Sequence, residues 1–520
     1  MRFQASNLPT KNFSPASRPG GDRTLNDRIG INSLKKCIST AEQATASIQG
    51  GMTVAMSGYA MAGYPKAVIE VLAGRKRSGE NLTINLVTGA NVPWLDETLG
   101  AEHIIARRAP MCASRTLAAQ ANNGSLRYVE QQMSKMPRLL RNDSFGKIDV
   151  AVVEALGFDE NGNMIPSSSV GMTHHLMNAA DEIIVEINLA QPEHLLNLHD
   201  IYIPAAPPDT QPIPLVRTNQ RIGKSGIPVD LKKVRYIVET DIPERMGTLP
   251  TGTAVTENIA THLLNFLELE FRKNRGILPP LQTGFGSIAD SIAEAFQHSE
   301  FSNLQFFCGG ITEPVMELLV SGKATALSTG GLGMSERVEQ ILKDTPNLQD
   351  YLVIRNGDIT NNAEVISRLE LIALNTGIEI DIYGNVNSSH ITGSRVVNGI
   401  GGGANFAQNA GLSIVLIPSE AKGGVISNIV PMVSHQDIGE HDVDVVVTEH
   451  GAADLRGLDD GERADAIIAQ CASEAYREPL SAYLHIARKK CGGHHPQLPD
   501  EAFAWYRRLK EDGSMLEQQS

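Results

Sequence analysis

Apolar residues gather along the chain in short runs that are rich in β-branched side chains. Stretches of mixed polarity, long enough for helices, separate these runs. A short run that is apolar throughout is typical of a strand buried on both faces of a mostly parallel sheet. The predicted strands are MTVAMSG (52–58), LTINLVTGA (82–90), IDVAVVEA (148–155), EIIVEIN (182–188), IEIDIYGN (378–385), LSIVLIP (412–418) and VDVVVTE (443–449).

Helical patterns lie between these strands. The segments 64–77 and 287–297 are predicted helices. In CGGITEPVMELLVSGK (308–323), two glycines precede an amphipathic helix, Pro314 suits its first turn, and Glu313 lies near its positive end. Strands that alternate with helices predict a doubly wound α/β fold.

The two halves of the chain repeat one pattern. IDVAVVEALGFDENGN and VDVVVTEHGAADLRG each run a buried strand into a glutamate, Glu154 or Glu449, followed by a polar turn. This echo favours two related α/β domains, each with an open, mostly parallel sheet.

The segment 203–229 is dense in proline and is the candidate linker between the two domains. The start of the chain also contains prolines and has no apolar core, which indicates a mobile tail; its basic, acid-poor composition leaves a transit peptide as the alternative. The expected organisation is a tail at 1–27, an N-terminal domain at 28–229, and a C-terminal domain at 230–520 that ends in a helical cap from residue 459.

Composition narrows the function. The chain has 520 residues, a net charge of -14 and a pI near 5.5, which argue against nucleic acid or an anionic membrane as a partner. No apolar run is long enough to span a bilayer. The 5 cysteines are scattered and form no C-x-x-C pair, which favours a reducing compartment. We expect an enzyme of small molecules in the cytoplasm, or in mitochondria if the source is a eukaryote.

The most glycine-rich stretch is NGIGGGANFAQNAG (398–411). Consecutive glycines let backbone N–H groups converge on an anion or a developing oxyanion. The strand LSIVLIP follows, with Lys422 beyond its carboxyl end. Ligands of open α/β sheets collect at these ends, so Glu449 is expected to face the same crevice.

Other chemistries fit less well. Gly399, Gly401 and Ala404 satisfy the dinucleotide pattern G-x-G-x-x-A, with Glu420 about twenty residues on, but the preceding strand is short and a tight turn explains the glycines better. The sequence contains no G-x-S-x-G elbow and no P-loop. CGGHH (491–495) lacks a second pair of metal ligands.

Several long motifs together resemble one family. They are MSGYAMAGYPKAV, DIYGNVNSSHITGS, NGIGGGANFAQNAGLSIVLIPSEAKGG, IVPMVSHQD and VTEHGAADLRGL. The chain is similar, from about residue 28 to its end, to the succinyl-CoA:acetate CoA-transferases and acetyl-CoA hydrolases of the class I CoA-transferase superfamily. The resemblance implies two α/β domains of the CoA-transferase type, acyl-CoA and carboxylic acids as substrates, coenzyme A in place of any metal, and a homodimer.

In that family a glutamate attacks the thioester, and CoA then moves through an enzyme-bound thioester to the second acid. The resemblance implies that the amides of Phe285 and Gly402 form the oxyanion hole, that Asn361 supports the acyl group, and that Glu449 lies beside the nucleophile. Arg245 would hold a substrate carboxylate. The residues implied to contact CoA are Thr283, Gly284, Gly286, Ser287, Asn398, Gly401, Gly403 and Lys422.

The family's nucleophilic glutamate is missing. Counting back from Ser321-Gly322-Lys323 places Gly309 at its position, within FFCGGITE. Glu313 lies four residues away, too far for near-contact geometry, and Cys308 has the surroundings of a structural cysteine. The alpha subunits of citrate lyase resemble this chain in having GGIT here, and in them the acid substrate attacks the thioester directly.

Direct attack by the substrate is the preferred hypothesis for this chain, with Gly309 clearing the volume of a side chain. We expect an acyl-CoA:carboxylate CoA-transferase. The alternatives are an acetyl-CoA hydrolase, a carrier-protein thioester transferase, and a silent CoA-binding protein.

Overall fold

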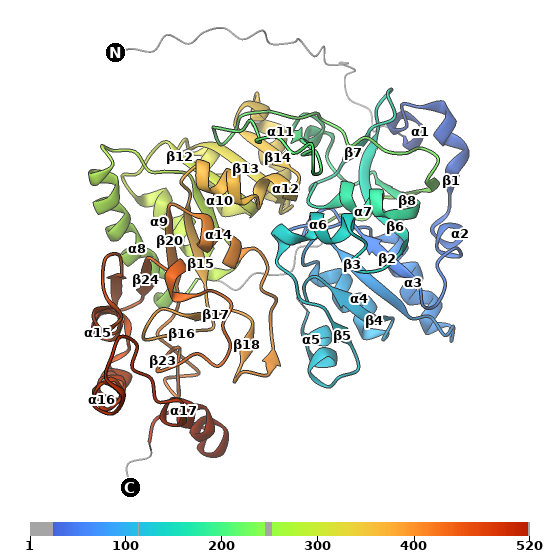
Figure 1. Ribbon diagram of the computed structural model, residues 1–520. Helices are drawn as coiled ribbons and strands as arrows, with labels where there is room; N and C mark the ends of the chain where they lie inside the picture. Colours follow the sequence, from blue (N-terminus) through green and yellow to red (C-terminus); the bar gives the residue numbers. More distant parts are fainter. Residues whose placement is uncertain (1–23, 113, 245–251, 518–520) are drawn as a thin grey trace.

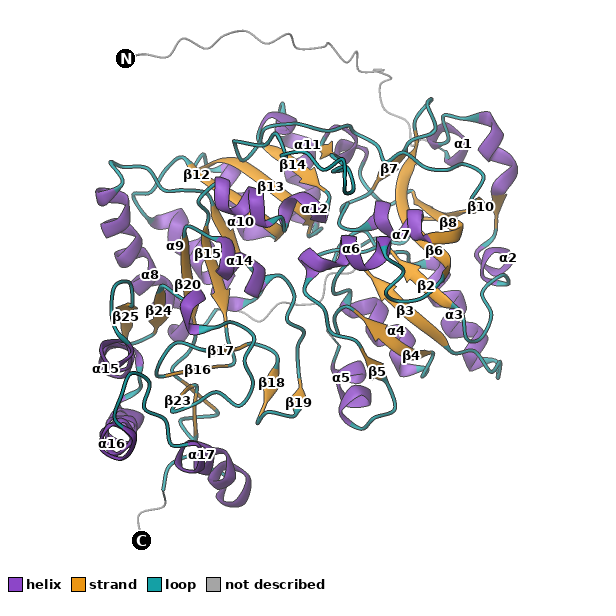
Figure 2. Ribbon diagram, viewed as in Figure 1, coloured by secondary structure: helices purple, strands orange, loops and turns teal. Residues whose placement is uncertain are grey.

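The structure is a computed structural model that describes residues 24–112, 114–244 and 252–517. Two α/β halves lie side by side, the N-terminal half in blue to green and the C-terminal half in yellow to red (Figure 1). Each half is built on one large sheet with helices on its faces (Figure 2). The predicted α/β class is confirmed.

The first sheet is parallel throughout except for one strand. Its order is β1-β10-β8-β6-β2-β3-β4-β5, and β7 pairs antiparallel with β6. All four strands predicted in this half are present. The strands are β1 (Ile38–Ser39), β2 (Thr53–Met56), β3 (Ile84–Thr88), β4 (Ile105–Ala109), β5 (Arg127–Tyr128), β6 (Ile148–Phe158), β7 (Met164–Pro166), β8 (Ala180–Asn188) and β10 (Val234–Thr240).

Helices cover both faces of this sheet. On one face α2 (Ala41–Thr45), α3 (Ala67–Arg77), α4 (Pro93–Ala101) and α5 (Arg115–Asn122) pack in a row. The helix predicted at 64–77 is α3, and the Glu186 carboxylate of β8 caps it by accepting from the amides of Lys66, Ala67 and Val68. On the other face lie α6 (Met136–Arg141) and α7 (Thr173–Ala179).

The second sheet has the order β25-β24-β20-β15-β11-β12-β13-β14-β9. Its pairs are parallel apart from β24 with β25. The strands are β9 (His199–Asp200), β11 (Leu281–Thr283), β12 (Leu304–Ile311), β13 (Ala324–Leu332), β14 (Leu352–Arg355), β15 (Ile372–Thr376), β20 (Leu412–Leu416), β24 (Val445–Thr448) and β25 (Gly451–Asp454).

The helices of this half follow the sequence closely. The helix predicted at 287–297 is α9, and the helix within 308–323 is α10, with Pro314 in its first turn. The helical cap from residue 459 is also present, as α15 to α17. The helices are α8 (Ala254–Lys273), α9 (Ser287–His298), α10 (Glu313–Val320), α11 (Glu336–Asp344), α12 (Gly357–Thr360), α13 (Ala363–Arg368), α14 (Gly403–Asn409), α15 (Asp460–Cys471), α16 (Glu474–Cys491) and α17 (Pro499–Asp512).

One predicted strand of the parallel sheet is wrong. Within 378–385 only β16 (Glu379–Asp381) is extended, and it belongs to a small sheet with β17 (Val386–Asn387) and β23 (Ile429–Val430). The chain turns at once because the Asp381 carboxylate accepts the amides of Tyr383, Gly384 and Asn385. An acid that caps a turn therefore outweighs the apolar run.

The two sheets exchange strands near the expected linker. β9 precedes the segment 203–229 and pairs with β14 of the second sheet, whereas β10 follows it and lies between β1 and β8 of the first. The chain therefore enters the second sheet at β9, returns to the first at β10 and moves finally to the second at β11, so no single boundary at residues 229 and 230 divides the two sheets. Of the tail expected at 1–27, residues 1–23 lie outside the described residues. The last residues of the expected tail belong to the short helix α1 (Leu25–Arg28).

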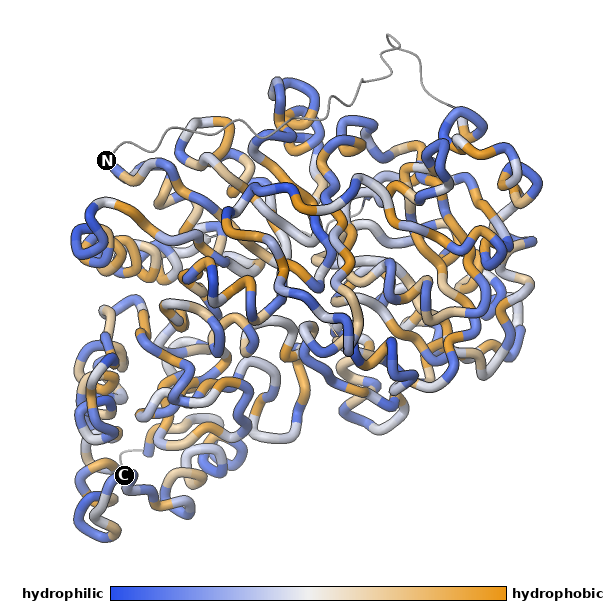
Figure 3. The backbone as a smooth tube through the Cα atoms, turned by 45° about the horizontal axis from the view of Figure 1, so that its top comes forward, coloured by the Kyte–Doolittle hydropathy of each residue, from blue (hydrophilic) through white to orange (hydrophobic). Residues whose placement is uncertain are grey.

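The largest apolar core is continuous across both halves. One cluster includes Ala55 and Val153 of the first sheet together with Leu281 and Phe306 of the second. Runs of apolar residues accordingly pass through the interior of both halves (Figure 3). No helix of the described residues is long and apolar enough to cross a membrane.

Candidate functional site

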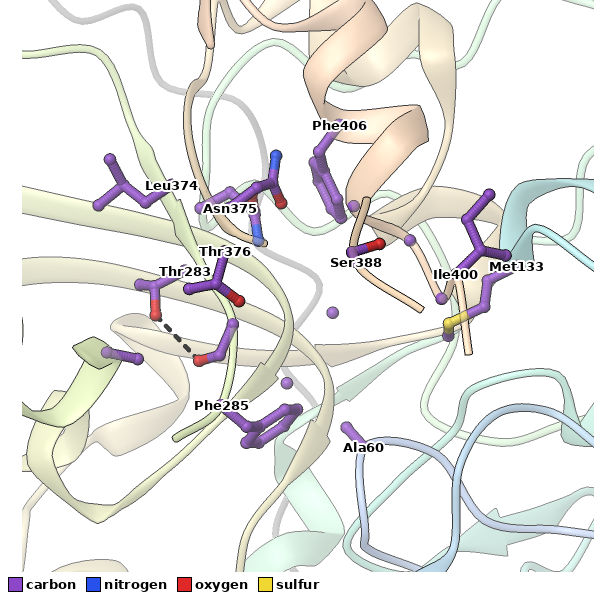
Figure 4. Close-up of a pocket in the computed structure, with 18 of the residues that line it drawn as sticks. Ala60, Met133, Thr283, Phe285, Leu374, Asn375, Thr376, Ser388, Ile400 and Phe406 are labelled. Carbon is purple, nitrogen blue, oxygen red and sulfur yellow. Dashed lines mark hydrogen bonds between the residues drawn. The ribbon is translucent and has the colours of Figure 1, made fainter. Parts of the chain in front are cut away.

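A cavity of about 360 Å³ opens at the carboxyl ends of the second sheet. Residues from both halves line it: Ala60 and Met133 come from the first, and Phe285, Asn375 and Phe406 from the second (Figure 4). Its size suits a small-molecule site. Among the described lining residues, Tyr59 is the one side chain with an ionisable group.

The loop between β2 and α3 brings Tyr59 to the cavity. Ala60 and Met61 have φ values of 54° and 66°, and the backbone groups of Tyr59 and Ala62 bond each other across this turn. Non-glycine residues hold such left-handed angles only when the surroundings impose them. The turn fixes the Tyr59 side chain, which is 1% exposed, in the interior.

Tyr59 fixes the amide of Asn361. Its hydroxyl donates to Asn361 Oδ1 at 2.5 Å, and Thr360 Oγ1 donates to the same oxygen at 2.9 Å. Burial raises the pKa of Tyr59, so it remains a neutral donor. Two donors on Oδ1 leave Nδ2 as the outer atom of the amide. Helix α13 is capped by Asn362, so Asn361 does not cap it and is available to the site.

Gly309 and Gly310 lie near the carboxyl end of β12 and line the cavity. A Cβ at Gly309 would lie 3.8 Å from Asn361 Oδ1 and 3.9 Å from Tyr59 Oη, which is ordinary contact. A Cβ at Gly310 would lie 2.1 Å from Phe285 Cζ and 2.5 Å from Ala60 Cβ, which no side chain tolerates without movement. Gly309 therefore opens toward Tyr59 and Asn361, and Gly310 admits Phe285.

Phe285 and Gly402, whose amides are the predicted oxyanion hole, both line the cavity. Gly284 O accepts from Thr283 Oγ1 at 3.0 Å, shown as the dashed line in Figure 4. Gly401 O accepts from Met133 N at 3.2 Å. In a trans peptide the N–H points opposite to the C=O, so the amides of Phe285 and Gly402 point away from these contacts. Neither amide has an acceptor within the described parts of the chain.

Most of the glycine-loop residues predicted from the sequence lie together. Thr283, Gly284, Asn398, Gly401 and Gly403 line the cavity with Phe285, Gly402, Gly309 and Asn361. Gly286, with φ of 115°, and Ser287 begin α9 next to it. The glycine loop is also tied to the first half, because Ile400 N donates to Glu130 Oε1 at 2.7 Å.

Lys422 lies outside the cavity wall. It occupies the turn of a hairpin formed by β21 (Glu420–Ala421) and β22 (Ile426–Ser427), and its side chain is exposed. Its ammonium group has no hydrogen-bond or ion-pair partner among the described residues, and its role in binding CoA stays a prediction.

Glu449 does not lie beside Gly309. It follows β24, which is separated from β12 by β20, β15 and β11. Four strand spacings amount to roughly 19 Å. Its carboxylate accepts instead from the amide and hydroxyl of Ser419 at 2.9 and 2.5 Å. The sequence located the correct edge of the sheet, but the strand order separates this acid from the cavity.

The two substitute nucleophiles are held elsewhere. The Glu313 carboxylate accepts from Ser335 Oγ at 2.5 Å and is not part of the cavity wall. Cys308 is 1% exposed, and burial raises the pKa of its thiol to about 12. Neither side chain lines the cavity.

Arg245 lies outside the described residues, but the residue before it is firmly anchored. The Glu244 side chain is 2% exposed and lies 3.2 Å from Lys66 Nζ, which also contacts Glu154 at 2.5 Å. Burial alone would lower the pKa of Lys66, but the two carboxylates raise it. Glu154, expected at a strand end, therefore lies within β6 and serves this ion-pair network.

Two clusters of the described residues have the residue types of a metal site. One is Glu440, Asp460 and His495, which includes a histidine of the CGGHH stretch. The other lies between the two halves. His174, His175 and Asp358 each place a ligand atom within 4.8 Å of the others. His175 Nε2 and Asp358 Oδ2 already bond each other at 2.9 Å. His174 and His175 lie in the first turn of α7, and Asp358 lies in the first turn of α12. The positive ends of these two helices disfavour a cation. The cluster is a contact between α7 of the first half and α12 of the second.

Tyr59 is the site residue that the sequence did not single out. It lies in the motif MSGYAMAGYPKAV, but a tyrosine after a strand is usually a core residue. Its partner Asn361 is 302 positions away, so only the packed halves bring the two together.

Known proteins match the chain over nearly its whole length. The models of the acetyl-CoA hydrolase/transferase N-terminal and C-terminal domains match residues 28–244 and 339–484. A succinyl-CoA:acetate CoA-transferase of Clostridium kluyveri is 37% identical over 495 residues, 94% of this chain and 92% of that protein. An acetyl-CoA hydrolase of Kluyveromyces lactis is 36% identical over 519 residues, 95% of this chain and 98% of that protein.

The fold is also found among solved structures. RipA from Yersinia pestis aligns with a TM-score of 0.67 and 20% identity, over 88% of this chain and 99% of that one. At this identity the likeness concerns the fold alone. The family models and the full-length relatives decide the assignment: this chain belongs to the acetyl-CoA hydrolase/transferase family of enzymes.

Proposed function

We propose that the protein is an acyl-CoA:carboxylate CoA-transferase in which the acid substrate itself attacks the thioester. The proposed substrates are acyl-CoA and small carboxylic acids such as acetate, propionate and succinate, in keeping with the names of the relatives. No glutamate of the protein takes part as a nucleophile.

The reaction balances without a protein nucleophile. A carboxylate oxygen of the acceptor acid attacks the thioester carbon, the C–S bond breaks, and CoA leaves as thiolate. The products of this step are the thiolate and a mixed anhydride of the two acids. The thiolate then attacks the acceptor's carbonyl carbon, the C–O bond breaks, and the donor acid leaves as carboxylate.

One observation carries this mechanism: among the described residues, the cavity wall offers no carboxylate and no thiol, and Tyr59 is neutral. The chemistry of the wall is that of hydrogen-bond donors. The amides of Phe285 and Gly402 and Nδ2 of Asn361 would stabilise the charge on the thioester oxygen. One such donor contributes about 10²–10³ in rate.

The test is a single turnover with ¹⁸O-labelled acceptor acid and excess enzyme. Direct attack transfers one labelled oxygen to the released donor acid in the first turnover. An enzyme carboxylate would supply unlabelled oxygen instead, and would form a CoA thioester visible in the intact mass of the protein. We expect label in the donor acid and an unchanged protein mass.

Other products point to the other functions. Free CoA without a new thioester identifies an acetyl-CoA hydrolase. Transfer of the acyl group only to a carrier-protein thiol identifies a carrier-protein thioester transferase. Binding of CoA without any turnover identifies a silent CoA-binding protein. The homodimer implied by the resemblance and the cytoplasmic or, in a eukaryote, mitochondrial location expected from the sequence stay predictions. Sedimentation and fractionation would test them.

A further inference from the structure

Two primary amides inside the cavity lack hydrogen-bond partners. Gln282 is 5% exposed and Asn375 is 7% exposed, and both line the cavity. Gln282 Oε1 and Asn375 Nδ2 are buried without a partner among the described residues. Buried amides are nearly always bonded, so an unpaired one calls for a ligand or a water.

The two amides share one face of the second sheet. Gln282 of β11 is level with Ala373 of β15, and Thr283 with Leu374. Side chains alternate along a strand, so Gln282 and Asn375 point to the same side. They lie on neighbouring strands with an offset of two residues, which places their α-carbons roughly 8 Å apart. A narrow group fits between them.

Their place in the cavity follows the order of the strands. Gly309 lies on β12, Gln282 on β11, Asn375 on β15 and Leu416 on β20, and these strands are consecutive neighbours. The hairpin that carries Lys422 follows β20 along the chain. The amides thus lie between the acyl end of the cavity and the exposed cation. In CoA the pantetheine arm joins the thioester to the phosphates in the same order.

We propose that Gln282 and Asn375 clamp one secondary amide of the pantetheine arm of CoA. One side chain accepts from the N–H of the arm, and the other donates to its C=O. A trans amide carries these two groups on opposite edges, which suits partners on two strands. The unpaired atom of Gln282 is the acceptor Oε1, and that of Asn375 is the donor Nδ2. This inference rests on the proposed function, because it needs a CoA thioester in the cavity.

A substrate carboxylate fits the pair less well. A carboxylate takes donors only, and the unpaired set contains an acceptor, Gln282 Oε1, as well as a donor. Water could satisfy both atoms in the empty enzyme, and the arm would then displace it.

Calorimetric binding of CoA analogues tests the clamp. The probes are CoA and two analogues in which an oxygen replaces the N–H of one or the other pantetheine amide. We expect wild type to bind one analogue about tenfold more weakly than CoA, the effect of one lost buried hydrogen bond. Gln282→Met removes the acceptor of the N–H and should bind CoA and that analogue within about twofold of each other. Asn375→Leu removes the donor to the C=O and should weaken the binding of CoA and the analogue alike, by about tenfold.

The ratio of the two dissociation constants separates a clamp from general damage, which weakens both ligands alike. Asn85→Leu is the control, because Asn85 bonds Gly51 O in the first sheet, and should keep the tenfold ratio. An unchanged ratio in Gln282→Met, with CoA still bound, overturns the clamp and leaves the function standing. A raised KM for the acid with an unchanged ratio assigns the pair to the carboxylate instead. Absence of CoA binding in wild type overturns the proposed function itself.

Discussion

At the scale of single residues, the site depends on neutral groups held in place by burial. Tyr59, Thr360 and Asn361 form one such group, in which two hydroxyls fix an amide. Gly309 and Gly310 form another, in which adjacent glycines have different tasks. These roles follow from contacts between distant segments, so composition and spacing do not show them.

Replacing Tyr59 by Phe should lower kcat by about tenfold to a hundredfold with little change in KM for CoA. The substitution removes the Tyr59 hydroxyl and leaves Thr360 as the one donor that orients Asn361. Donors to the developing oxyanion act mainly in the transition state. Steady-state kinetics with acetyl-CoA measures the effect. Tyr476→Phe is the matched control, because that buried hydroxyl donates to Gly424 O away from the cavity. Equal losses in both variants would assign Tyr59 a purely structural role.

Alanine at the two glycines should give opposite results. Gly309→Ala makes only ordinary contacts, so its free energy of unfolding should stay within about 0.5 kcal/mol of wild type. Gly310→Ala forces Phe285 and Ala60 apart and should cost about 1–3 kcal/mol. Urea unfolding compares the two. Equal stabilities would mean that the Phe285 ring moves aside freely.

At the scale of secondary structure, buried strands were the most predictable part. Runs such as 148–155 and 412–418 are apolar on both faces and became β6 and β20. The prediction failed at 378–385, where the Asp381 carboxylate ends the strand. Glu449 was placed at the correct edge of the sheet, but its distance from Gly309 depends on strand order, which one sequence does not reveal.

His199, on the short strand β9, makes the free energy of unfolding depend on pH. Burial lowers the pKa of His199 to about 4, although Nε2 donates to Ser167 O at 2.8 Å. Below pH 6.5 the unfolded chain gains a proton there and the folded chain does not, so stability falls as pH falls toward 4. One such histidine accounts for about 2 kcal/mol between pH 7 and pH 5.

The variant His199→Gln keeps a donor for Ser167 O and should flatten this pH dependence by that amount in urea titrations. His441, with a side chain that is 88% exposed, provides the control: His441→Gln should leave the dependence unchanged. An unaltered slope in His199→Gln would show that this histidine is protonated in the folded protein.

At the scale of the whole molecule, a buried ion pair anchors the crossing strand β9 to the second sheet. Arg355 of β14 and Asp200 of β9 are 0% and 2% exposed and bond each other. Asp200 also accepts the amides of Ile222 and Gly223. The expected domain boundary at residues 229 and 230 follows this contact closely along the chain. Because one apolar core is shared by both halves, the proline-rich composition of 203–229 does not mark a boundary between two separate domains.

Asp200→Asn should lower the free energy of unfolding by about 3–5 kcal/mol, because it leaves the Arg355 charge buried and unpaired. Both halves should lose stability in one transition, followed by fluorescence and by circular dichroism. Asp465→Asn breaks an exposed pair with Arg488 and should cost less than about 1 kcal/mol. Two separate transitions in Asp200→Asn would contradict a single cooperative unit.

The crossing of β9 and β10 has a consequence for any cut in the chain. A break between residues 229 and 230 would yield two pieces, each holding a strand that completes the sheet of the other. The first piece would lack the strand between β1 and β8, and the second would lack the edge strand beside β14. Each piece alone would present open sheet edges and aggregate. Together they should reassemble, since the hydrogen bonds missing from one are carried by the other.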